Sequence, residues 1–267
     1  ARERLEQPVT LQRIDRTYRG KPTHHYMLDG VKADGVTTVL SNTLPKPALT
    51  AWAARTVAEF VADNQIEVTA LWGEGRDRMV NELKQTPYRE RDAAANRGTE
   101  VHALAEKLVR GEEVEVPGEL AGYVDAYVRF LDEWQPKPLL VEAPIGNRKW
   151  NLAGTLDLVA KLPNGQVALM DVKTSKGVYP EVALQLAAYA NAEFYMELGC
   201  EVPMEELGIT HGYVIHVRDG SYQVLPVDIS ADGPWKVMQH LIWLSRRIGD
   251  AMKPWLGSPA QTPGDAA

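Results

Sequence analysis

The sequence predicts an α/β fold in which helices and β-strands follow one another along a chain of 267 residues. Three observations predict it. Apolar residues recur at helical spacing after Gly98, three strand-like runs follow between Leu139 and Lys173, and an almost wholly apolar helical stretch then precedes two further strands. A chain of this length can form one elaborated domain, or a core domain with a smaller lobe.

The segment before Gly98 carries weaker signals, and its elements are predicted from turns and caps. Asp-Gly pairs between short β-branched runs predict a hairpin over residues 26–40. Thr50 is a candidate N-cap for a helix that reaches Val61, and a second helical stretch covers residues 78–84. The chain therefore divides into an N-terminal elaboration, a core and a loose tail, which span residues 1–95, 96–256 and 257–267.

From Gly98 onward each element follows from its own pattern. The stretch GTEVHALAEKLVRG has apolar residues at helical spacing and ends at Gly111, so a helix is expected to begin at Gly98. A second helix is expected in ELAGYVDAYVRFLDEW. The later elements are strands over 139–145, 151–162 and 165–173, a helix over 180–199, strands over 211–217 and 222–228, and a helix over 235–252.

The loop between the second and third of these strands sets their register. If Pro163, Asn164 and Gly165 form a three-residue loop, Asp157 lies directly across from Asp171. A two-residue turn would place the two aspartates on opposite faces, because a slip of one residue reverses the pleat. The apolar pattern favours the three-residue loop, which puts on one face Leu156, Leu158, Ala160, Leu162, Ala168, Met170 and Val172.

The other face then carries Asp157, Asp171 and Lys173, a set that indicates a metal site. Two carboxylates at cross-strand distance repel each other unless a cation lies between them or one of them is protonated. Oxygen ligands favour a hard ion, Mg2+ or Mn2+, which activates water and neutralises charge on a phosphoryl oxygen. Lys173 could hold the water or stabilise the phosphorus. The set therefore predicts phosphodiester hydrolysis, and its alternative is a structural salt bridge.

Four other residues are candidates for the same site. His102 lies at the border of the apolar stripe of its helix, where it is either a ligand or a half-buried histidine. Glu142 either adds a carboxylate from the neighbouring strand or faces solvent. Gln185 and Tyr189, four residues apart on an apolar helix, project together. They lie either beside the carboxylates or in the core, where backbone groups would satisfy the amide.

Composition limits the remaining classes. The single cysteine, Cys200, excludes a disulfide framework and a four-thiolate iron-sulfur cluster. The formal charge of -7 neither supports nor excludes a polyanionic substrate, since a local basic cleft can exist on an acidic protein. No apolar stretch approaches the roughly 18 residues of a membrane span, and the first ten residues lack a signal-like segment. A cytoplasmic protein without a membrane partner is expected.

Four motifs together resemble the RecB-type nuclease domain of the PD-(D/E)XK superfamily. They are RGTEVH, GTLD, DVKT and QLAAY, in the order of that family, and they span Arg97 to Tyr189. The resemblance implies a restriction-endonuclease-like core, which is a central mixed β-sheet flanked by helices. It also implies an enzyme that cuts DNA and leaves 5'-phosphates.

The resemblance also assigns roles to residues. The implied ligands of the catalytic Mg2+ or Mn2+ are His102, Asp157, Asp171 and the backbone carbonyl of Val172. Lys173 would be the catalytic lysine, and Gln185 and Tyr189 would contact DNA near the cleavage point. Glu142 and Arg97 are additional candidates.

Without cysteine ligands or helicase motifs, the chain is similar to the stand-alone exonucleases that bacteriophages carry beside a recombinase or single-strand annealing protein. We therefore expect an exonuclease in DNA recombination, repair or replication. The alternatives are a structure-dependent or restriction-like endonuclease, which would share every catalytic residue, and a catalytically idle DNA-binding module. The complete catalytic set argues against the idle module.

Overall fold

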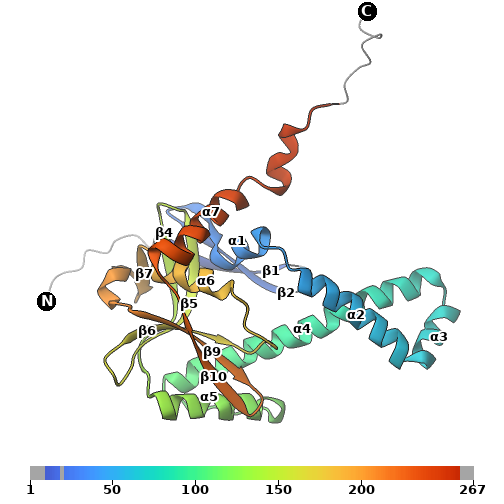
Figure 1. Cartoon of the computed structure of the whole chain (residues 1–267), viewed down its shortest axis with the longest axis horizontal. Helices are drawn as coiled ribbons and strands as arrows, with labels where there is room; N and C mark the ends of the chain where they lie inside the picture. The colour runs from blue at the N-terminus through green and yellow to red at the C-terminus, as the bar shows by residue number, and fades with distance from the viewer. Residues whose placement is uncertain (1–9, 19–20, 259–267) are drawn as a thin grey trace, which may run out of the picture.

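The computed structural model describes residues 10–18 and 21–258, which form an α/β fold around one curled, mixed β-sheet (Figure 1). The strands are β1 (Leu11–Tyr18), β2 (Lys21–Leu28), β3 (Val31–Gly35), β4 (Lys137–Asn147), β5 (Leu152–Lys161), β6 (Val167–Lys173), β7 (Phe194–Glu197), β8 (Cys200–Pro203), β9 (His211–Arg218) and β10 (Ser221–Val227). Two neighbouring pairs are parallel, β3 with β5 and β6 with β9, and the other pairs are antiparallel. The expected α/β class is confirmed.

Helices cover both faces of the sheet (Figure 1). They are α1 (Val36–Thr43), α2 (Pro47–Asp63), α3 (Gln65–Gly73), α4 (Arg76–Val109), α5 (Ala121–Trp134), α6 (Val182–Ala190) and α7 (Lys236–Ser245), with short turns η1 (Gly118–Leu120), η2 (Met204–Leu207), η3 (Ala231–Trp235) and η4 (Gly249–Trp255). The core under α4 and α5 includes Ala105, Tyr127, Phe130, Leu158, Met170 and Ile215. The core under α1, α6 and α7 includes Val39, Leu156, Leu169, Leu186, Val214 and Ile242.

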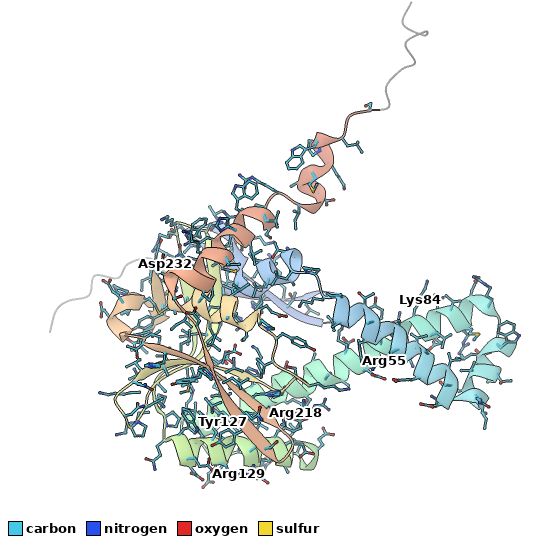
Figure 2. The ribbon with its side chains drawn as sticks, viewed as in Figure 1. Arg55, Lys84, Tyr127, Arg129, Arg218 and Asp232 are labelled. Atoms are coloured by element: carbon cyan, nitrogen blue, oxygen red, sulfur yellow. The ribbon has the colours of Figure 1, made fainter. Side chains whose placement is uncertain are left out.

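Three helices form an arm that projects from the sheet. The arm consists of α2, α3 and the N-terminal half of α4, with α3 at its tip (Figure 1). Arg55 of α2 and Lys84 of α4 lie on it, away from the strands, whereas Tyr127 of α5 lies beside the sheet (Figure 2). The C-terminal half of α4 returns to the sheet and packs on it through Ala105. One helix thus connects the arm to the core.

Several predicted element ends are wrong. The helix expected to begin at Gly98 begins at Arg76 instead, so the proposed division between residues 95 and 96 falls inside α4. Thr50 is not a cap, because α2 already begins at Pro47 and has no side-chain cap hydrogen bond. The hairpin expected over 26–40 has its turn at Asp29 and Gly30, but its second strand ends at Gly35, where α1 follows.

The helix expected over 180–199 ends at Ala190, and the short hairpin of β7 and β8 follows. Similarly, α7 ends at Ser245 and is followed by the 3-10 turn η4. The other expected elements, from α5 through β6 and the pair β9 and β10, are present. Most of the predicted tail lies outside the described residues. Among the described helices, none is both long and apolar enough to cross a bilayer.

Candidate metal centre

The candidate site lies where one edge of β5 changes partner. One edge of β5 pairs with β4 along nearly its whole length. The opposite edge of β5 pairs with β3 at Leu152 and Ala153 and with β6 from Leu158 onward. Within the described chain, no backbone pairing joins residues 154–157 to either β3 or β6, and we call this segment the β5 gap. A side chain in the β5 gap can therefore reach a space that a continuous sheet would fill.

The three-residue loop predicted from the sequence is confirmed. The amide of Leu162 donates to the carbonyl of Gln166 at 2.8 Å, and Gly165 closes the loop with φ +86°. Val159 pairs with Leu169, as expected. Continuing this register by two residues along β5 places Asp157 opposite Asp171.

Glu142 occupies the equivalent position on β4. The pairs on either side of it join Val141 to Leu158 and Ala143 to Leu156, so Glu142 lies opposite Asp157. Ala143 and Leu156 belong to the core under α6, whereas Val141 and Leu158 pack in the core under α5. Leu156 therefore does not share the face of Leu158, contrary to the prediction, because both strands change faces at this pair.

Glu142 also has a φ of +50°, which is uncommon for a residue other than glycine. Such a conformation is found at functional sites more often than elsewhere, because the surrounding structure has to hold it in place. Here it coincides with the change of faces in β4. The sequence offered Glu142 only as one of two alternatives, and the structure places it beside Asp157.

Asp157 is the centre of the group. Its Oδ2 accepts a hydrogen bond from the amide of Val172 at 2.9 Å, and the same oxygen lies 3.4 Å from Nδ1 of His102 on α4. Ligand atoms of His102, Glu142 and Asp157 all lie within 4.8 Å of one another. A histidine and two carboxylates at this spacing could hold a divalent cation.

Asp171 is differently engaged. Its side chain is only 2% exposed, Oδ1 accepts a hydrogen bond from Nε2 of Gln185 at 3.0 Å, and Oδ2 lies 2.6 Å from Nζ of Lys173. Oδ2 nevertheless has no hydrogen-bond partner among the described residues, so its contact with Lys173 is an ion pair without hydrogen-bond geometry. The Lys173 ammonium therefore lies on one side of this buried oxygen, which can accept a further partner.

Burial and mutual repulsion raise the pKa of both flanking carboxyls. Burial first, and then the charge of Asp157, raise the pKa of Asp171 to about 7, although the Lys173 ammonium opposes the shift. The same two causes, in the same order, raise the pKa of Glu142 to about 7. Both carboxyls are therefore protonated more readily than usual, and a bound divalent cation would favour their ionised forms.

The predicted ligand set is therefore only partly brought together as a compact group. His102 and Asp157 join Glu142, while the Asp171 carboxylate contacts Lys173 and Gln185. Val172 contributes its amide to Asp157. The histidine and carboxylate donors of the compact group are chemically suited to a divalent cation, and Asp171 is adjacent to this group.

Tyr189 lies on α6, one turn after Gln185, and its hydroxyl accepts a hydrogen bond from Nε2 of Gln185 at 3.3 Å. Burial, with Asp157 and Asp171 next in importance, raises the pKa of Tyr189. A Cβ at Gly154 would lie 2.7 Å from the Tyr189 ring, so only glycine permits this close approach in the β5 gap. The prediction that Gln185 and Tyr189 project together is confirmed.

Arg97 is placed elsewhere. Its guanidinium carbon lies 5.9 Å from the ring centroid of Tyr123 on α5, and Arg97 does not line the two cavities at the site. The structure therefore gives it no contact with the acidic group among the described interactions.

Sequence reasoning missed the residues that face the acidic group from the N-terminal strands. A cavity of about 510 Å³, which we call the N-terminal recess, opens from the β5 gap and is lined by Arg13, His24, His25 and Lys32. Tyr26 fixes the position of these strands, because its hydroxyl lies 2.8 Å from Oγ1 of Thr155. The only available signal was the mixture of basic and aromatic residues in KPTHHYM.

Comparisons with known proteins add no assignment. The chain matches no protein-family model, and a search of curated proteins finds no match.

Proposed function

We propose that this protein is a metal-dependent DNA exonuclease with a restriction-endonuclease-like core of the PD-(D/E)XK type. The observation that carries the proposal is the convergence of Asp157, Asp171 and Lys173, from two adjacent strands, with His102 from α4 and Gln185 from α6. A structural salt bridge would need only Asp171 and Lys173. It would not account for the second carboxylate and the histidine beside them.

The proposed cofactor is Mg2+ or Mn2+, since the donors are mainly carboxylate oxygens. Asp157, His102 and Glu142 would hold it, with Asp171 and the carbonyl of Val172 next to them. When bound, such an ion lowers the pKa of water and neutralises charge on the phosphoryl group. The product would be a 5'-phosphate.

The protein's own groups have separate roles in this proposal. Lys173, whose side chain is 30% exposed, orients the attacking water or donates a hydrogen bond to the phosphoryl oxygen. Gln185 holds the Asp171 carboxylate through Oδ1, while Oδ2 faces the Lys173 ammonium. Tyr189 supports Gln185 from the next turn of α6.

Digestion of labelled DNA tests this proposal. Linear DNA should lose nucleotides in the presence of Mg2+, and Asp157→Ala or Lys173→Ala should abolish the loss. Lys84→Ala is a matched control, because Glu82, Leu83 and Lys84 repeat the carboxylate-X-lysine spacing on the exposed arm. Unchanged activity in either site variant would refute the assignment.

A covalently closed circle distinguishes an exonuclease from an endonuclease, since an exonuclease requires an end. The proposal expects linear substrates to be degraded while circles survive. As a phage-type enzyme, the protein would work beside a recombinase or single-strand annealing protein in DNA recombination or repair. Co-purification of the full chain with such a protein tests that partner.

A further inference from the structure

The chain leaves the sheet directly after Lys173, at the end of a parallel pairing. β6 pairs with β9 from Ala168 beside His211 to Lys173 beside His216, and within the described chain this pairing goes no further. The end of a strand pairing opens more readily than its interior. The position of the Lys173 backbone therefore depends on how the residues that follow it are held.

Two side chains of β9 hold the carbonyl of Ser175. Nε2 of His216 donates a hydrogen bond to this oxygen at 2.8 Å, and Nη1 of Arg218 donates to it at 2.7 Å (Figure 2). A carbonyl oxygen only accepts, so Nε2 carries a hydrogen, and the two donors match the two lone pairs of the oxygen. We call His216 and Arg218 the Ser175 clamp.

The Ser175 clamp continues the contact between the two strands after their backbone pairing ends. Extending the register of Lys173 and His216 by two residues would bring Ser175 beside Arg218. The backbone of Ser175 does not pair with β9 there, and the two side chains provide the contact instead.

Lys173 thus lies between two anchors along the chain. On one side the amide of Val172 donates to Oδ2 of Asp157 at 2.9 Å, and on the other side the Ser175 clamp holds the chain. Nζ of Lys173 lies 2.6 Å from Oδ2 of Asp171. The place of this ammonium beside the carboxylate therefore depends on both anchors.

Hydrogen bonds rather than packing hold Ser175. Its side chain is exposed, and it lines both a cavity of about 520 Å³ next to α4 and a cavity of about 190 Å³ next to α1. Atoms that face a cavity lack packing contacts on that side. Oγ of Ser175 donates to the carbonyl of Gly177 at 2.8 Å, but this contact is local and does not reach the sheet.

The same segment leads to Gln185. Residues 174–181 connect β6 to α6, where Gln185 donates to Oδ1 of Asp171 at 3.0 Å. Lys173 and Gln185, which contact the two oxygens of Asp171, therefore lie at the two ends of one connection. A shift of this connection would disturb both contacts of the carboxylate.

We propose that His216 and Arg218 are positioning residues, which hold Lys173 beside Asp171 by fixing the carbonyl of Ser175. The consequence for catalysis rests on the proposed nuclease function, whereas the hold on Lys173 can be measured without DNA. Both residues lie beyond the four motifs that suggested the site.

Acetylation of the lysines, followed by mass spectrometry, measures the hold on Lys173 without DNA or metal. His216→Ala combined with Arg218→Ala removes both donors, so Lys173 should be acetylated at least about fivefold faster, because two hydrogen bonds no longer oppose opening. Lys84, exposed on the arm, is the internal reference and should keep its rate. An unchanged rate at Lys173 would overturn the inference.

Further variants separate positioning from a general loss of structure. In His216→Ala or Arg218→Ala alone one donor remains, so each single variant should keep most of the wild-type protection of Lys173. Arg218→Lys in the His216→Ala background restores a donor and should reverse most of the increase, and failure to do so would contradict the role of the hydrogen bond. His216→Phe with Arg218→Met removes the donors but keeps similar bulk, and it decides the question should the alanine pair not fold.

Arg129→Ala is the matched control. Nη2 of Arg129 on α5 donates to the carbonyl of Gly220 at 2.7 Å, in the turn of the same hairpin and away from Ser175 (Figure 2). Its loss should leave the acetylation of Lys173 unchanged. An increase equal to that of the double variant would attribute the effect to a loosened hairpin and overturn the inference.

Digestion of linear DNA with Mg2+ then tests the consequence for catalysis. In the double variant kcat should fall at least about tenfold, because a small misplacement of an active group can cost this much. KM should change little, since Lys173 is assigned to the reaction step. Faster acetylation with a wild-type kcat would overturn the positioning role. If the wild type cuts no DNA, the proposed function is refuted, while acetylation still decides whether the Ser175 clamp holds Lys173.

Discussion

Asp157 Oδ2 accepts a hydrogen bond from the amide of Val172 at 2.9 Å, so a side chain of β5 satisfies a backbone donor of β6. This contact occurs next to the β5 gap, where the two strands begin to pair. The proposed metal ligand therefore also joins the two strands. Its roles in stability and in chemistry can be separated by substitution.

Asp157→Asn keeps an oxygen for the Val172 amide but removes the negative charge. We expect it to abolish metal-dependent DNA cleavage and to change the free energy of unfolding little. Asp157→Ala leaves a buried amide without a partner, which costs about 1–3 kcal/mol in addition. Urea unfolding and DNA digestion of both variants check this, and equal stability of the two variants would contradict it.

The raised pKa of Asp171 makes stability depend on pH in the absence of metal. Its folded-state pKa is about 7 and its ordinary value is 3.8, so the folded protein binds the extra proton between these values. This group's contribution to stability is therefore greatest near pH 4 and is lost as the pH rises to 7. Thermal unfolding in EDTA should therefore show a less favourable contribution of Asp171 at pH 8 than at pH 5.

Asp171→Asn is the control for that measurement, because the amide does not titrate. Asp171→Asn should be more stable than the wild type at pH 8, and this difference in stability should diminish at pH 5. Mn2+ should stabilise the wild type mainly at the higher pH, since protons and the cation compete for the same oxygens. A difference that is constant with pH would argue against a protonated Asp171.

Glu142 is the ligand that the structure brings to the compact group with His102 and Asp157. Glu142→Gln should weaken Mn2+ binding at least about tenfold, a loss typical even of residues that only support a ligand. Calorimetric titration with Mn2+ measures it. Glu106→Gln is a matched control on the neighbouring helix, where Glu106 is paired with Arg110. Similar affinities for the two variants would exclude Glu142 from the site.

Gly154 should tolerate no side chain. In Gly154→Ala the new methyl group would lie 2.7 Å from the buried Tyr189 ring, and overpacking of this kind costs about 1–3 kcal/mol. Because Tyr189 supports Gln185, cleavage should also slow. Gly118→Ala is the control, since a Cβ there meets nothing within 4 Å. Chemical denaturation of both variants compares them, and equal stability would show that Tyr189 can move aside.

The sequence predicted the register of β5 and β6 because local chemistry determines it. Pro163, Asn164 and Gly165 specify one loop, and that loop places Asp157 opposite Asp171 whatever the rest of the chain does. The pairing of Gln185 with Tyr189 follows from helical spacing in the same way. Half of the candidate site was therefore readable from short segments.

The parts that could not be predicted depend on contacts between distant segments. Gly98 marked a helix start in the sequence, yet a single glycine costs only about 1 kcal/mol within a helix, and the Ala-rich turns before it continue α4. The apolar run after Ala190 fits strand and helix equally by periodicity, and pairing of Tyr195 with Ile145 of β4 decides for a strand.

The β5 gap is likewise non-local. It exists because β3, which is over 110 residues earlier in the chain, takes the edge of β5 that β6 occupies farther along. No sequence motif in β5 predicts that change of partner. Sequence patterns therefore could not predict the recess beside Asp157 or its basic wall.

The continuity of α4 has a mechanical consequence. Its 34 residues extend roughly 50 Å at 1.5 Å per residue, from the tip of the arm to His102 and beyond. Any tilt of the arm that kept α4 rigid would therefore also move His102, whose Nδ1 lies 3.4 Å from Oδ2 of Asp157. Pro87, which removes one backbone hydrogen bond, lies between the tip of the arm and His102 and is the position at which α4 would bend instead. The arm and the site of the proposed chemistry thus share one helix, with Pro87 between them.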